Sequence, residues 1–150
     1  MRFVVQRVSN ASVTIENNVV GKIGSGFLVL IGITDSDTKE IADALVKKLI
    51  NLRIFKDSED KMNLSIKDVG GSLLLVSQFT LYADCSHGNR PGFTQAAKPV
   101  FANELYEYII SKCRAYDVPV ETGEFGADMK VSLLNDGPVT IILDSDELTK

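Results

Sequence analysis

The dipeptide Gly137-Pro138 lies between two apolar, strand-like runs, 131–134 and 139–143, and it is the feature that most constrains the fold. Proline has no amide hydrogen to donate to a sheet ladder, so it belongs at an edge, a strand start or a bulge. Glycine allows backbone angles that other residues avoid, and X-Pro bonds are the ones that adopt the cis form readily. Turn chemistry alone favours a tight turn that joins two strands.

Length and composition are those of one globular domain. The chain has 150 residues, of which 45% are hydrophobic and 24% charged, enough to form a core without metal or disulfide support. Cys85 and Cys113 are far apart and form no CxxC pair, which predicts a reduced, cytoplasmic protein. His87 follows Cys85 by two positions, but two soft ligands are too few for zinc, so no metal and no cofactor are expected.

The charge distribution argues against a broad nucleic-acid surface. The formal net charge is −4, whereas non-specific affinity for nucleic acid comes mostly from neutralising phosphates. Residues 1–75 carry ten Lys or Arg and nine acids, but residues 76–150 carry six and eleven. Any nucleic-acid partner is therefore expected to be held over a small area. No apolar run approaches the length needed to span a bilayer.

The apolar pattern predicts a single α+β domain, residues 1–150, with largely antiparallel sheet. Thr38 is expected to cap a helix that ends near Asn51, and Pro99 to open a second helix. Residues 56–71 are expected to form a loop with a helical turn, and residues 144–147 a solvated end. Strands are expected at 3–8, 12–16, 19–23, 26–33, 73–81, 118–122, 129–134 and 139–143.

The hydroxyl-bearing run at the end of the predicted strand 73–81 is the best candidate for chemistry. Ser77 and Thr80 could serve as nucleophiles, but His87 is the only histidine and no GxSxG elbow is present, so a Ser-His-Asp triad is poorly supported. Backbone N–H groups at this strand end could instead stabilise an oxyanion. The bland alternative is that both hydroxyls follow ordinary strand preferences and that Phe79 is a core aromatic. Phe79 could also offer a platform on which a base stacks.

Residues 77–81 read SQFTL and residues 135–140 read NDGPVT. These two motifs resemble the signatures of the D-aminoacyl-tRNA deacylase family, SQFTL and NxGPxT, and match both without a mismatch. The resemblance covers nearly the whole chain, in order and at the family's spacing. It continues through QRV at 6–8, LRIF at 52–55, GNRP at 88–91, LY at 105–106 and GEFGA at 123–127.

The resemblance implies a layered β/β/α sandwich, with sheets packed on one another and helices on an outer face, assembled as a homodimer. It implies hydrolysis of the ester between a D-amino acid and the 3′-terminal adenosine of tRNA, a proofreading reaction that rejects glycine poorly. The implied catalytic residues are Ser77, Gln78, Phe79 and Thr80, whose backbone N–H groups would stabilise the oxyanion while a ribose hydroxyl assists.

The resemblance also implies how the L-enantiomer is rejected. A cis Gly137-Pro138 loop from the partner subunit would crowd the side that an L side chain occupies. The remaining residues with implied roles in binding or selection are Asn135 and Thr140 of the same motif, Met129 as a pocket wall and Arg7 as a brace. Arg90 and Lys98 could lie near the tRNA phosphates or be ordinary solvated cations.

Three other functions remain as alternatives. The first is a non-catalytic, nucleic-acid-associated module of the same fold, which a basic chain would favour. The second is an esterase or amidase for small molecules, which needs a triad that the sequence lacks. The third is a relative that edits L-alanine on tRNA, in which the Gly-Pro bond is trans; the intact NxGPxT motif and Arg7 favour the D-specific branch.

Overall fold

In the computed structural model, which describes residues 1–148, the chain folds into long antiparallel strands and two crossover helices. Residues 149 and 150, which the single-domain prediction included, lie outside the described residues. The chain forms one α+β domain. Its elements are β1 (Arg2–Ile15), β2 (Asn18–Ile23), β3 (Gly26–Gly32), α1 (Lys39–Asn51), β4 (Phe55–Lys56), β5 (Met62–Leu64), β6 (Ser72–Ser77), the 3-10 helix η1 (Phe79–Tyr82), α2 (Pro99–Arg114), β7 (Val120–Thr122), β8 (Lys130–Asp144) and α3 (Ser145–Leu148).

The main sheet is largely antiparallel, as predicted, but it is one continuous sheet, and two of its strand pairings are parallel. Its strands follow the order β2-β1-β3-β6-β7, and β8 pairs with β1 beside this path. β1 is antiparallel to β2, β3 and β8, whereas β3–β6 and β6–β7 are parallel. Parallel neighbours require long crossovers, which here contain α1 and α2, and the strand pattern alone did not reveal this pairing.

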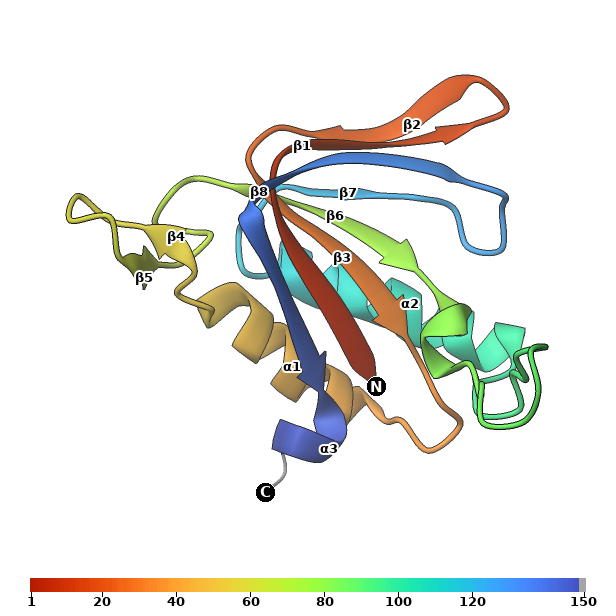
Figure 1. The fold of residues 1–150 in the computed structure, drawn as a ribbon. Coiled ribbons are helices and arrows are strands. Elements are labelled where there is room, and N and C mark those ends of the chain that lie inside the picture. Colours follow the sequence, from red (N-terminus) through yellow and green to blue (C-terminus); the bar gives the residue numbers. More distant parts are fainter. Residues whose placement is uncertain (149–150) are drawn as a thin grey trace.

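The sheet curls until it is nearly a closed barrel (Figure 1). β2 passes over β6 and β7 so closely that a Cβ atom on Gly21 would lie 2.5 Å from the Thr122 carbonyl oxygen. The two layers of the sandwich are therefore two halves of one sheet. The apolar side chains enclosed between them are Val8, Ala11, Val13, Ile23, Leu28, Leu74 and Val76.

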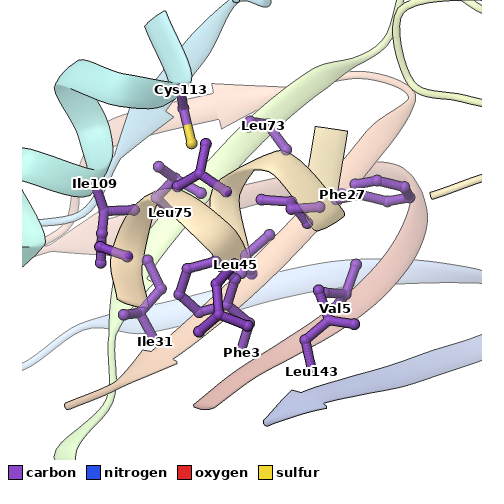
Figure 2. Close-up of a cluster of buried hydrophobic side chains, with 14 of the residues drawn as sticks. Phe3, Val5, Phe27, Ile31, Leu45, Leu73, Leu75, Ile109, Cys113 and Leu143 are labelled. Carbon is purple, nitrogen blue, oxygen red and sulfur yellow. The ribbon is translucent and has the colours of Figure 1, made fainter. Parts of the chain in front are cut away.

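The two long helices cover the other face of the sheet, which confirms the predicted outer helical layer (Figure 1). Thr38 caps α1 as predicted, because its Oγ1 accepts the Ile41 N–H at 3.2 Å. Figure 2 shows Leu45 of α1 and Ile109 of α2 directed into a cluster with Phe3 and Leu75 of the sheet. Each of these four side chains is fully buried.

β8 corrects the turn predicted at Gly137-Pro138. Residues on both sides of the dipeptide pair with β1, as in Thr140 with Gln6 and Asn135 with Val8, and the register shifts between these pairs. The chain therefore does not reverse. The proline occupies a bulge within one long edge strand, where its missing N–H breaks no ladder hydrogen bond.

Three smaller segments also differ from the prediction. Residues 56–71 include the β4–β5 hairpin, and the strand expected at 73–81 ends at Ser77, where η1 follows. The tail forms α3, whose Ser145 is buried and accepts a hydrogen bond from the Met1 amino group at 2.9 Å. Asp37 accepts a second bond from that amine at 2.7 Å. No helix within residues 1–148 has the length and apolar character needed to traverse a lipid bilayer.

Candidate active site

An apolar cavity of about 640 Å³ opens at the carboxyl ends of the parallel strands β3 and β6. Open α/β sheets bind ligands at this end of their strands, because the polar loops that follow the strands meet there. Lys98 is the one charged residue among those that line the cavity. The lining consists of Ile31, Ile33, Val76, Ser77, Gln78, Phe79, Phe93, Ala96, Ala97, Lys98, Pro99, Ala102, Phe125, Gly126, Ala127, Met129 and Val131.

The SQFT segment forms one rim of this cavity. Ser77 ends β6, and the Gln78 N–H donates to the Ile31 carbonyl at 2.8 Å, which fixes the point where the strand gives way to η1. Phe79 and Thr80 begin η1, and their N–H groups have no acceptor among residues 1–148. Thr80 does not line the cavity, but its Oγ1 accepts a hydrogen bond from Gln78 Nε2.

Phe79 is not a core residue. Its side chain is 56% exposed, so the core interpretation of this aromatic is wrong. It meets Phe93 edge to face, with ring centroids 5.0 Å apart and an interplanar angle of 71°. Both rings line the cavity, and more than half of the Phe79 surface stays open to a ligand.

The connection between β7 and β8 forms another part of the wall. Met129 lines the cavity. Its sulfur packs against Gly123, where an added Cβ atom would lie only 2.5 Å from Sδ. Phe125 packs on Tyr106 with centroids 6.1 Å apart. Tyr106 donates to the Leu75 carbonyl at 2.7 Å, and burial raises the pKa of its hydroxyl, which stays protonated as a donor.

The Gly137-Pro138 peptide bond is cis, and Arg7 braces the residues around it. Arg7 is buried; its Nε donates to the Asp136 carbonyl at 2.9 Å and its Nη1 to the Ile54 carbonyl at 2.6 Å. Gly137 has φ 141°, and a Cβ on it would lie 2.7 Å from Cγ2 of Val139. Only glycine fits this backbone without displacing its neighbours.

Asn135 closes the same bulge from its other side. Its Oδ1 accepts the Val139 N–H at 2.7 Å, while its Nδ2 donates to the Val139 carbonyl at 3.1 Å and to Thr140 Oγ1 at 3.4 Å. The first and last residues of the NxGPxT motif thus contact each other. They hold the Gly-Pro dipeptide as a projecting, defined loop.

The structure separates the two motifs. Ser77, Gln78, Phe79 and Met129 are brought together around the cavity, whereas the second set of predicted residues does not line it. Gly137 and Pro138 are exposed on β8. The set that lies away from the cavity of its own chain is Arg7, Asn135, Gly137, Pro138 and Thr140.

The loop at residues 83–93 contributes Phe93 to the cavity but none of its reactive groups. His87, Cys85 and Arg90 are exposed there and do not line the cavity, so the triad alternative gains no support. Burial raises the pKa of the Cys113 thiol to about 12, which leaves it unreactive. In residues 1–148, no group of three or more His, Cys, Asp or Glu side chains is placed to hold a metal ion.

Sequence reasoning missed most of the cavity wall. Phe93, Phe125 and the small residues Ala96, Ala97 and Ala102 come from three separate segments, so no local spacing connects them. Consecutive alanines just before Pro99 were the available signal, because small residues leave room at a helix start. The fold and cavity together define a ligand-binding α+β protein whose site lies beyond the ends of parallel strands.

Comparison with known proteins identifies the family. The D-Tyr-tRNA(Tyr) deacylase family matches residues 4–144. The D-aminoacyl-tRNA deacylase of Clostridioides difficile (strain 630) is 55% identical over 147 residues, covering 98% of this chain and 99% of its own. That of Thermosipho africanus (strain TCF52B) is also 55% identical, over 148 residues, covering 99% of each.

Two solved structures share the fold. One, a c-Myc DNA Unwinding Element Binding Protein, has a TM-score of 0.90 and 39% identity, covering 96% of this chain and 98% of its own. The other, a probable eukaryotic D-amino acid tRNA deacylase, has a TM-score of 0.80 at 21% identity, covering 95% and 97%. The chain belongs to the D-aminoacyl-tRNA deacylase family and is an ester hydrolase, which confirms the resemblance stated from its motifs.

Proposed function

We propose that the protein removes D-amino acids from tRNA by placing the ester in its cavity between backbone donors and the substrate's own ribose hydroxyl. The observation that carries this mechanism is the pair of N–H groups on Phe79 and Thr80, which lack acceptors among residues 1–148 beside an apolar cavity. Fixed donors of this kind stabilise a developing oxyanion by about 3–4 kcal/mol each.

The ribose supplies what the protein lacks. The hydroxyl vicinal to the ester lies next to the reacting carbonyl and can assist its cleavage, so no histidine or carboxylate is needed at the reaction centre. The absence of such groups from the residues that line the cavity supports this division of roles. Ser77 and Gln78 then act mainly by fixing the main chain at the end of β6.

We propose that Gly137-Pro138 rejects L-amino acids from the site of a partner subunit. The loop is rigidly braced yet exposed, and it lies away from the cavity of its own chain, which supports a role in a neighbouring molecule. Its carbonyl groups would occupy the space that an L side chain requires. Because rejection operates by exclusion, many D side chains are tolerated, and glycine, which has no side chain, is also removed.

The edge strand β8 supports the homodimer that this role requires. β8 pairs with β1 alone in residues 1–148, and it presents Leu134 and Ile142, which are 57% and 63% exposed, on either side of the Gly-Pro loop. Exposed apolar groups along an unpaired edge favour association. A two-fold pair of such surfaces would place one loop in each site.

An additional role in binding nucleic acid is the second candidate. It draws on the structural relative named for binding a c-Myc DNA unwinding element, at 39% identity. The net charge of −4 weighs against it, since a protein that grips DNA by its phosphates is normally basic. Binding of that DNA by this chain, measured alongside its cleavage of D-aminoacyl-tRNA, would favour the second candidate.

The test compares the two enantiomers. The protein is incubated with D-Tyr-tRNA and L-Tyr-tRNA, with and without a chelator, and loss of the ester is followed. We expect rapid release of D-tyrosine, an L-ester that decays at its spontaneous rate, and no effect of the chelator. Equal cleavage of both esters would remove the selective role of Gly137-Pro138, and activity lost to the chelator and regained with zinc would remove the metal-free mechanism.

A further inference from the structure

We propose that the ammonium group of Lys98 binds the phosphate on the 5′ side of the substrate's terminal nucleotide, so that the site recognises an ester attached to a nucleic acid. The proposal rests on the proposed function and adds a binding residue to it. Its basis is charge: the wall of the cavity is otherwise formed by uncharged residues.

Lys98 is available to an anion. Its side chain is exposed at the cavity wall and forms no ion pair within residues 1–148. The nearby carboxylate of Asp35 accepts the backbone N–H of Lys98 at 3.3 Å, so Asp35 holds the main chain at this point. The ammonium group can therefore meet a ligand without breaking an existing salt bridge.

The backbone on both sides of Lys98 is held in place at the rim of the cavity. The preceding Ala97 donates its N–H to the Ile33 carbonyl at 2.9 Å, and the following Pro99 is the first residue of α2. Lys98 occupies the N-cap position of this 16-residue helix without a side-chain capping hydrogen bond, and the first residues of the helix line the same cavity. The helix dipole adds positive potential there, in the same sense as the ammonium charge.

The substrate brings its nearest negative charge to this rim. An aminoacyl ester and its adenosine can occupy an apolar cavity, but a phosphate is costly to bury there and must remain at the solvent edge. Of the cations in residues 1–148, only Lys98 lines the cavity; Arg90 belongs to the exposed loop 83–93 and does not. Lys98 therefore offers the terminal nucleotide its one charged contact at the cavity.

The experiment uses two non-hydrolysable analogues that differ by one group. Both are 3′-deoxy-3′-(D-tyrosylamino)adenosine, one with a 5′-hydroxyl and one with a 5′-phosphate, and their dissociation constants are measured by calorimetry. We expect the phosphate to strengthen binding to the unaltered protein about tenfold, as a charge-assisted contact at a wet rim would. Lys98→Ala should bring the ratio of the two constants near one, and Lys98→Arg should keep it.

Lys48→Ala is the matched control, because Lys48 is an exposed lysine on α1 that does not line the cavity, and it should keep the full ratio. With intact D-Tyr-tRNA, Lys98→Ala should also reduce the dependence of log(kcat/KM) on log[salt] by about 0.7, the value for one single-strand phosphate. A phosphate advantage that persists in Lys98→Ala, or that is missing from the unaltered protein, overturns the proposal. If the protein still cleaves D-Tyr-tRNA when either of these results is found, the proposed function stands and only the role of Lys98 is overturned. A protein that binds neither analogue and cleaves no D-ester would contradict both the proposed function and the role of Lys98.

Discussion

The two signature motifs occupy different places in their strands and have different surroundings. The SQFT segment ends a buried strand and lines a cavity of its own chain. The NDGPVT segment interrupts an edge strand, is held by Arg7 and Asn135, and faces outward. The SQFT segment thus lines a cavity, but few side-chain hydrogen bonds hold it. The NDGPVT segment is held by side-chain hydrogen bonds but lines no cavity of its own chain.

The difference has a physical explanation. Bracing a loop with a buried arginine and a fully bonded asparagine costs side-chain entropy and desolvation, which an ordinary surface turn does not require. Such rigidity is useful where a contact must be placed accurately, as in the exclusion of one enantiomer. The comparison therefore supports the proposal that each motif supplies half of a site.

The largest effect is expected from the substrate. If backbone donors and the ribose perform the chemistry, D-Tyr-tRNA ending in 2′-deoxyadenosine should show no measurable turnover, a loss of at least about a thousandfold. Ser77→Ala and Thr80→Ala should keep measurable activity, and His87→Ala should be near the unaltered protein. Single-turnover hydrolysis measures all four.

A covalent mechanism would give the reverse pattern. Deleting a true triad nucleophile or base lowers kcat by about a millionfold. Such a loss in Ser77→Ala, Thr80→Ala or His87→Ala, with the 2′-deoxy substrate still cleaved, would show that the SQFT segment acts through its side chains and that the contrast between the motifs is misplaced.

The brace under the Gly-Pro loop gives the next effect. Arg7→Lys keeps the charge but cannot reach both the Asp136 and Ile54 carbonyls, so one buried acceptor loses its partner. We expect the D-over-L ratio of kcat/KM to fall about 10- to 100-fold and unfolding stability to fall by about 1–3 kcal/mol. Rates on both esters and thermal unfolding measure these changes.

Arg53→Lys is the control for this variant. Arg53 is exposed and donates to the Asn63 carbonyl at 2.9 Å in the β4–β5 region, far from either motif in the chain. It should change neither enantiomer ratio nor stability appreciably. A folded Arg7→Lys protein with undiminished selectivity would mean that the loop does not depend on its brace.

The smallest effect concerns the C-terminal end of the strand that carries the loop. Burial alone would raise the pKa of Asp144, but the Asp146 N–H and the hydrogen bond and charge of Arg2 lower it below the usual range. A lowered folded pKa means that the carboxylate stabilises the fold at neutral pH and loses this contribution as acid protonates it. Asp144→Asn should cost about 0.5–1 kcal/mol near pH 7, and the difference should shrink as the pH falls below the ordinary aspartate value of about 3.9.

Denaturant unfolding of Asp144→Asn and the unaltered protein across this pH range measures the difference. The prediction fails if the gap between the two proteins is constant with pH, because then the carboxylate contributes no charge-dependent stability. It also fails if the gap widens in acid, since this would require a folded pKa above the unfolded value.

Local chemistry determined which features the sequence revealed. Thr38 and Pro99 were correctly placed because helix caps and first turns depend on neighbouring residues. The parallel pairing of β3 with β6 was missed, since register between distant strands leaves no local trace. The β4–β5 hairpin was missed for a related reason, since Phe55 and Leu64 pair across a polar segment with weak strand preference.

The residues of the candidate site also fall into those that the local sequence revealed and those that it did not. Ser77, Phe79 and Met129 were found because two of them belong to a contiguous motif and the third follows from the family resemblance. Phe93 and Phe125 escaped because a cavity wall gathers residues from separate loops. Gly137-Pro138 was expected to form a turn, and only the pairing of both halves of β8 with β1 shows that it is a bulge.

Subunit mixing tests the central claim, that each site joins the SQFT cavity of one chain to the Gly-Pro loop of the other. A cavity variant, Phe79→Ala, is mixed with a loop variant that combines Gly137→Val with Pro138→Ala, each inactive alone on D-Tyr-tRNA and each shown to be folded. Random exchange makes half of the dimers mixed, each with one intact site, so about a quarter of the unaltered activity should return. Mixtures that exchange subunits, as a tagged copy would report, yet remain inactive would contradict the account, as would full activity in a monomer.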